Sequence, residues 1–135
     1  MARPGAAPRM LHYRLSGDWS ALVGLSDADN DRLSLRVARP DDWWFHVRGM
    51  PGSHVLLRGP DGAEPGKDIL EETAAIAAYH SKARSGGVVA VSCTRARYVT
   101  KPRGAKAGTV QIRKEAVFKV RPDVSRLAPP TASRE

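Results

Sequence analysis

A run of basic residues between Val91 and Gly108 has the spacing expected of a phosphate-binding edge. Arg95 and Arg97 are two residues apart, so on a strand both guanidinium groups would project from the same face. The residues that follow interleave cations with glycine and proline, which lets backbone N–H groups and cations approach a phosphate closely. A solvated hairpin loop without a ligand fits the same spacing. The cations of this segment are Arg95, Arg97, Lys101, Arg103 and Lys106.

A second segment, from Asp41 to His54, combines aromatic residues with histidines. Two tryptophans and a phenylalanine in a row are costly to expose, so we expect at least one or two of them to anchor the core. An aromatic face left open could instead stack an unpaired base beside Arg48. Nothing in the spacing of His46 and His54 supplies a third metal ligand. Ser53 and His54 could serve in acid–base catalysis, but neighbouring residues on a strand face opposite ways. We therefore expect no metal, no cofactor and no catalytic residue.

The positive charge of the chain is confined to one part of the sequence. The formal net charge is +8 over 135 residues. Residues 82–121 contain 11 Lys and Arg against one Glu, whereas residues 1–81 contain 9 Lys and Arg against 11 Asp and Glu. A solvated surface normally mixes both signs, so this block predicts an anionic partner, either nucleic acid or an acidic membrane surface. General solubility is the plainer alternative.

Composition narrows the class of protein further. No apolar run approaches the roughly 20 residues that cross a bilayer, and the first eight residues lack the layout of a secretion signal. The single cysteine, Cys93, excludes an intramolecular disulfide and a cysteine-based metal cluster. We expect a cytoplasmic protein that does not bind membranes.

The hydrophobic pattern predicts an α+β fold in which a mostly antiparallel, curled β-sheet packs against one main helix. Asp68 as N-cap, Glu71 three residues later and apolar residues near helical spacing predict a helix over about 67–84, ended by Gly86-Gly87. Apolar patterns predict strands over 11–15, 19–23, 88–99, 109–113 and 116–120, and a short apolar run between two turn segments predicts a buried strand over 54–58. The short run 33–37 fits a strand or a helix.

The length of the chain suits one domain with one core. Both ends are rich in Ala, Pro, Arg and Ser and offer little to bury. We therefore expect a flexible N-terminal tail over 1–9, a domain over 10–122 and a flexible C-terminal tail over 123–135.

Taken together, these segments resemble the NFACT-R domain, the RNA-binding module of a family of ribosome quality-control proteins. The resemblance spans about Gly17 to Pro122, and several motifs in order make it more specific than any one of them. They are Asn30-Asp31, Asp42-x-Trp44-Phe45-His46, Pro51-Gly52-Ser53-His54-Val55, the alanine-rich helix from Ala74 to Ala83, and Val99-x-Lys101-Pro102-x-Gly104-Ala105-x-x-Gly108-x-Val110.

The resemblance implies a stand-alone RNA-binding module, because the larger relatives carry further domains that this sequence lacks. Two residues depart from the family pattern: Trp43 stands in place of an aliphatic residue, and Cys93 in place of an aromatic one. We expect nucleic-acid contacts from ten residues, namely Arg48, Ser53, His54, Lys82, Arg84, Arg95, Arg97, Lys101, Arg103 and Lys106. Seven further motif residues are expected to have structural roles, namely Asn30, Asp31, Asp42, Trp44, His46, Pro51 and Gly52.

Three functions fit this sequence. The first is binding of RNA, tRNA or rRNA, through a basic surface, in translation-related RNA metabolism or ribosome quality control, with the ribosome as a further partner. The second is an RNA-modifying or RNA-processing enzyme that uses His46, Ser53 and His54. The third is an adaptor that docks on an acidic protein. The first is our working hypothesis, and the sequence leaves the oligomeric state open.

Overall fold

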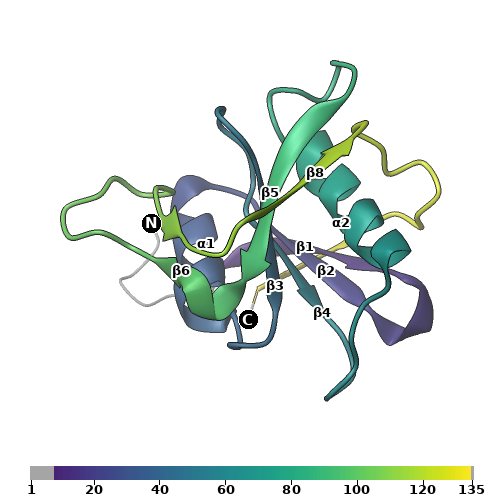
Figure 1. The fold of residues 1–135 in the computed structure, drawn as a ribbon, viewed down its shortest axis with the longest axis horizontal. Coiled ribbons are helices and arrows are strands. Elements are labelled where there is room, and N and C mark those ends of the chain that lie inside the picture. The colour runs from purple at the N-terminus through teal and green to yellow at the C-terminus, as the bar shows by residue number, and fades with distance from the viewer. Residues whose placement is uncertain (1–7, 135) are drawn as a thin grey trace.

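The computed structural model describes residues 8–134, and Figure 1 shows two helices on opposite sides of a twisted β-sheet. The sheet has seven antiparallel strands in the order β8-β5-β3-β4-β2-β1-β9. It is open, with β8 and β9 at its edges, so the predicted α+β class with a mostly antiparallel sheet and one main helix is confirmed. No helix of residues 8–134 is both long and apolar enough to span a bilayer.

Five strands of the sheet lie in segments that the sequence predicted as strands, with different ends: β1 (Arg9–Arg14), β2 (Ser20–Gly24), β4 (Val55–Arg58), β5 (Val89–Arg95) and β8 (Ala116–Val120). The sequence did not predict the other two, β3 (Trp43–Val47) and β9 (Thr131–Arg134). A separate two-stranded ribbon is made by β6 (Val99–Thr100) and β7 (Gln111–Ile112). Single 3-10 turns lie at Ser16–Asp18 and Ala96–Tyr98.

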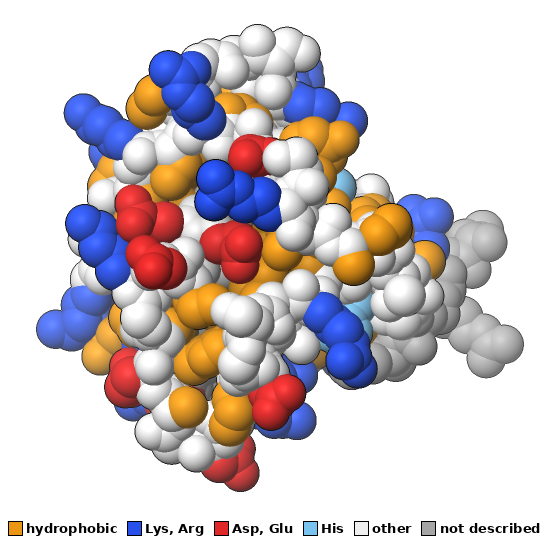
Figure 2. Space-filling view, turned by 90° about the vertical axis from the view of Figure 1, so that its right-hand side faces the viewer, with side chains coloured by type: hydrophobic (Ala, Val, Ile, Leu, Met, Phe, Trp, Pro, Cys, Tyr) orange, Lys and Arg blue, Asp and Glu red, His pale blue; other side chains and the backbone are white. Residues whose placement is uncertain are grey.

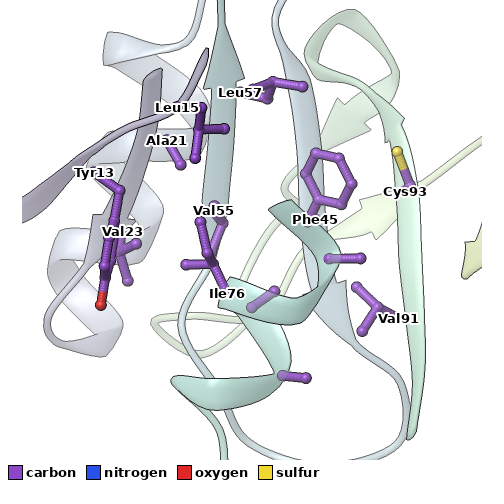
Figure 3. Packing of buried hydrophobic residues seen from close by; sticks show 13 residues of the cluster. Tyr13, Leu15, Ala21, Val23, Phe45, Val55, Leu57, Ile76, Val91 and Cys93 are labelled. Carbon is purple, nitrogen blue, oxygen red and sulfur yellow. The ribbon is translucent and has the colours of Figure 1, made fainter. Parts of the chain in front are cut away.

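One face of the sheet is covered by α2 (Lys67–Tyr79). The alanines of α2 let its backbone come close to β3, β4 and β5, and Ala74, Ile76 and Ala77 have no exposed surface. Figure 3 shows Ile76 of the helix among Val55, Val91 and Phe45 of the sheet. This layer forms the larger of two hydrophobic clusters.

The helix ends five residues earlier than the sequence predicted. His80 leaves the helical conformation with φ −91° and ψ 41°, and the hydroxyl of Ser81 donates to the carbonyl of Ala78 at 2.6 Å. Gly66 is the N-cap and makes no side-chain bond, so Asp68 lies inside the first turn and is not the predicted cap. The backbone pairing of Gly52 with Ser81 then draws the chain away from the helix axis.

The opposite face is covered by α1 (Asp27–Arg32) and the π-helical turn Leu33–Val37 that continues it. The run 33–37, which fitted a strand or a helix by pattern, is therefore helical. Leu33 packs with Trp44 and Leu56 in the second hydrophobic cluster, and the β6–β7 ribbon contributes Val99 to the same cluster. Trp44 and Phe45 point to opposite faces, so the two layers share β3 as their common wall.

The C-terminal residues, expected to form a flexible tail, instead return to the sheet. Val124 and Leu127 pack against the larger cluster, and β9 pairs with β1 from Arg9↔Arg134 to His12↔Thr131. The side chains of Thr131, Ala132 and Ser133 are exposed, so this strand is held by backbone hydrogen bonds, which no hydrophobic pattern reveals. Of the expected N-terminal tail, residues 1–7 lie outside the described part of the chain, and Arg9 already belongs to β1.

Trp44 is 3% exposed at the centre of the second cluster, and this burial generates a stability prediction. Trp44→Ala should lower the free energy of unfolding by about 3–5 kcal/mol, because it deletes a buried large aromatic side chain. Urea titration followed by circular dichroism measures the effect. The control is Val117→Ala on the exposed side of β8, which should cost about 0.5 kcal/mol or less. Equal unfolding midpoints for the two variants would contradict the core role of Trp44.

Candidate nucleic-acid interface

The glycine-containing loop 101–110 is held against α1 by contacts with Asp31. The ammonium group of Lys101 donates to the carbonyls of Lys106 (2.6 Å) and Thr109 (3.0 Å) and lies 3.2 Å from Oδ2 of Asp31. The other oxygen of Asp31 accepts the backbone N–H of Gly108 at 3.0 Å. Lys101 was expected to contact phosphate, but its ammonium group contacts the carbonyls of its own loop and the carboxylate of Asp31. Gly108 has φ +84°, a conformation that glycine adopts without strain.

A chain of buried hydrogen bonds joins the same loop to the centre of the sheet. The indole N–H of Trp44 donates to the hydroxyl of Ser34 at 2.9 Å, and that hydroxyl lies 2.7 Å from Nδ1 of His54. Nε2 of His54 lies 3.1 Å from the carbonyl of Gly108. A carbonyl can only accept, so Nε2 carries the proton and Nδ1 accepts from Ser34. We call this series the Trp44–Gly108 relay.

The relay explains why His54 does not reach a ligand. His54 is 1% exposed, both of its ring nitrogens have partners, and its backbone N–H donates to Oδ1 of Asn30 at 3.1 Å. Burial, with a smaller contribution from the neighbouring His46, lowers the pKa of His54 to about 4. His54 is therefore neutral at pH 7, as its accepting Nδ1 requires.

The proposed catalytic group of His46, Ser53 and His54 is not assembled as a nucleophile and base. The hydroxyl of Ser53 donates to the carbonyl of Gly24 at 2.7 Å, away from both imidazoles. His46 is half-buried with its ring centroid 5.3 Å from that of His54, and burial lowers its pKa as well. The hydrogen bonds of Ser53 and His54 thus go to groups outside this trio, and His46 lines a groove.

Two adjoining grooves meet around the loop between β3 and β4. One, of about 560 Å³, runs from His46 and Arg48 to Lys106 and Val110. The other, of about 440 Å³, runs from Ser53 to Lys82 and Arg84. Both include Asp27, Pro51 and Gly52, so they form one surface, which we call the Pro51 face.

Four of the expected RNA-binding cations line the Pro51 face. Arg48 is exposed but lies 3.3 Å from a carboxylate oxygen of Glu115, an acid that the sequence reasoning did not single out. Arg84 lies over the ring of Tyr79, 4.2 Å from its centroid, and its Nε donates to the carbonyl of Tyr79 at 2.7 Å. Within residues 8–134, Lys82, Arg84 and Lys106 form no ion pair, and neither does the exposed Arg103 of the nearby loop. These cations remain available to an anionic partner.

Arg95 and Arg97 lie elsewhere, because β5 ends at Arg95 and the 3-10 turn Ala96–Tyr98 follows. The strand face that was expected to carry both guanidinium groups into the loop is interrupted there. Arg95 pairs with Glu64 and Arg97 with Asp41, and both arginines line a separate groove. The single basic strip suggested by the sequence is thus divided over two sites.

The seven motif residues expected to be structural have observable contacts. Asp42 accepts from Arg58 Nη2 at 2.7 Å and from the backbone of Arg39 at 2.9 Å, which links β4 to the turn before β3. Gly52 leaves no room for a side chain, because a Cβ there would lie 2.9 Å from Cβ of Ser81. Asn30 accepts from the backbone of His54, Asp31 from the backbone of Gly108, and Trp44 donates to Ser34. His46 and Pro51 line the Pro51 face.

The face that carries α2 does not show one-sided charge. Figure 2 presents this side of the molecule, the right-hand side of Figure 1, with acidic and basic side chains interspersed among apolar ones. Charge segregation along the sequence therefore does not become a uniformly basic surface on this side.

The neutral histidines generate a pH prediction. Burial lowers the pKa of both His54 and His80 to about 4, below the value of about 6.5 in the unfolded chain. The unfolded state then binds more protons below pH 6.5, so the stability present above that pH should fall as the pH drops toward 4. His54→Gln, which keeps an N–H donor, should flatten this slope by about 1.4 kcal/mol per pH unit between pH 6 and 4.5. Urea titrations across this range test it, and parallel curves for the two proteins would refute it.

Comparison with known proteins agrees with this architecture. Residues 9–114 match the family described as NFACT protein RNA binding domain. The chain is 40% identical over 116 residues to "Rqc2 homolog RqcH" of Bacillus subtilis, covering 86% of this chain and 20% of that protein. It is 35% identical over 106 residues to the protein of the same name from Streptococcus suis, covering 78% of this chain and 19% of that protein.

A solved structure has the same fold. It is titled the structure of the C-terminal of the fibronectin/fibrinogen-binding protein from Streptococcus suis, and it aligns with a TM-score of 0.79 and 32% identity over 91% of this chain and 47% of that one. The chain thus spans about a fifth of the length of the curated relatives given above. With the family pattern matched over most of its length, the chain belongs to the NFACT protein RNA binding domain family.

Proposed function

We propose that this chain binds RNA on the Pro51 face. The observation that carries the proposal is the set of cations around this face, Lys82, Arg84 and Lys106, that form no ion pair within residues 8–134. Phosphate contacts supply much of the affinity of proteins for nucleic acids, and exposed cations that form no ion pair make such contacts without first giving up a carboxylate. The description of the family supports RNA as the anion.

The proposed RNA is a structured one of the translation machinery, tRNA or rRNA, and the proposed process is ribosome quality control. The resemblance to ribosome quality-control proteins and the relatives named Rqc2 homolog RqcH support both. Contact with a ribosome in the cytoplasm follows from the same proposal. The half-buried His46 and the apolar Val110 and Ile112 lie in the same groove as Lys106, which offers a surface for a base beside the phosphate contacts.

The loop geometry decides which variants can test this proposal. Lys101 fastens its own loop, so replacing it would disturb the fold together with the binding. Lys82 and Lys106 are exposed and serve better. The double change Lys82→Ala and Lys106→Ala should weaken binding of tRNA by about tenfold and make the dependence of log Kd on log salt shallower by about one unit per lysine.

Fluorescence anisotropy with labelled tRNA and a labelled rRNA fragment, over a series of salt concentrations, measures both quantities. Lys67→Ala with Arg126→Ala removes the same charge from exposed positions that line neither groove, and should change the affinity much less. Circular dichroism confirms the fold, since exposed lysines alter stability by about 0.5 kcal/mol or less. A folded Lys82/Lys106 variant that binds both RNAs as tightly as the control variant would reject the Pro51 face as the interface.

A further inference from the structure

A separate groove, of about 520 Å³, lies between the turn at residues 39–42, the loop at residues 59–64 and the end of β5. We call it the Trp43 groove. Three aromatic residues line it, Trp19, Trp43 and Tyr98. Four arginines and four acids also line it, namely Arg39, Arg58, Arg95, Arg97, Asp41, Asp42, Asp61 and Glu64. Its formal charge is therefore balanced within the chain.

Arg95 is held in place by three contacts. Its guanidinium group lies 4.0 Å from the centroid of the Trp43 ring, and Nη1 donates to the carbonyl of Asp41 at 2.7 Å. Nη2 then meets both oxygens of Glu64, at 3.0 and 2.8 Å. The ring and the carbonyl fix the guanidinium plane, so Glu64 only fills the outward side of a group that is already oriented.

Arg97 is arranged in a similar way. Its Nε donates to the carbonyl of Pro40 at 3.3 Å, and its Nη2 pairs with the carboxylate of Asp41. The two partner acids are far more exposed than the arginines, since the side chains of Asp41 and Glu64 are 82% and 72% exposed. Both acids stand in loop segments outside the helices and strands. Exposed ion pairs of this kind contribute little to stability, so they are displaced at small cost.

A phosphate group presents oxygens to a guanidinium in the same way as a carboxylate and carries comparable or greater charge. We propose that the Trp43 groove is a second phosphate-binding site for RNA, in which the carboxylates of Glu64 and Asp41 occupy the phosphate positions in the free protein. This inference rests on the proposed function. An RNA strand would displace the two acids and leave Arg95 and Arg97 in their present orientation.

The inference predicts that removing two acids strengthens binding. Asp41→Asn with Glu64→Gln should bind labelled tRNA about fivefold more tightly than the wild type at one fixed salt concentration, because RNA then displaces no ion pair. The charge-matched control is Glu71→Gln with Glu72→Gln on α2, which frees no arginine, since neither acid forms an ion pair within residues 8–134. Its affinity should change by about twofold or less, the effect of net charge alone. Anisotropy titrations of the 135-residue chain measure both.

A third pair of variants assigns the gain to the arginines. In a background with Arg95→Gln and Arg97→Gln, replacing Asp41 and Glu64 in the same way should change the affinity by no more than the charge control does, about twofold or less. An equal gain in the Glu71/Glu72 control, or a gain that persists without the arginines, would overturn the inference. The alternative ligand is a mononucleotide, for which AMP is the probe. If the Asp41/Glu64 variant bound AMP more tightly than tRNA, and bound tRNA no more tightly than the wild type does, the assignment to an RNA strand would be overturned.

The two proposals fail in different ways. If the wild type bound no RNA, the proposed function itself would fall. If the Lys82/Lys106 variant lost RNA affinity while the Asp41/Glu64 variant matched its charge control, the Pro51 face would stand and the Trp43 groove would not.

Discussion

The indole N–H of Trp44 is buried in the middle of the domain, and a buried donor without a partner costs about 1–3 kcal/mol. Ser34 supplies the acceptor, His54 then accepts from Ser34, and the carbonyl of Gly108 accepts from His54. Each group in the relay donates to the next. The relay therefore requires the sheet (Trp44), the helical turn after α1 (Ser34) and the loop that contains Gly108 to be in place together. The Pro51 face exists because this relay brings residues 46–54 and 106–110 to one surface.

Several of the basic residues that the sequence singles out form ion pairs with acids of the same chain. Arg48, Arg95, Arg97 and Lys101 all belong to the basic set that the sequence singles out, and each of them meets a carboxylate in the folded protein. The partner acids Asp31, Asp41 and Glu64 come from the N-terminal half, where acids outnumber bases. Folding therefore brings the acidic half against part of the basic half. Most cations of residues 82–121 form no ion pair within residues 8–134, and three of these, Lys82, Arg84 and Lys106, lie around the Pro51 face.

Much of the fold could be predicted from the sequence, because α2 and most strands have a regular apolar pattern. The central strand β3 was harder, since Trp43-Trp44-Phe45 does not alternate; both of its faces are covered, so both carry large apolar side chains. The break after Arg95 and the return of β9 depend on turn geometry and backbone pairing, which leave no hydrophobic signature. For the site, the motif residues indicated the right region, but no local pattern shows that Lys101 turns inward to Asp31 or that Ser34 joins His54 to Trp44.

The pairing of Arg9 with Arg134 places the first and last strands side by side, antiparallel, with backbones about 5 Å apart. A longer polypeptide that contained this domain would enter and leave it at nearly the same point. Tension along such a polypeptide would break the β1–β9 hydrogen bonds one after another, beginning at the Arg9–Arg134 pair, and not all at once. Because the exposed side chains of Thr131, Ala132 and Ser133 add little to hold β9, this edge strand would detach first and lengthen the polypeptide while the two-layered core stayed folded.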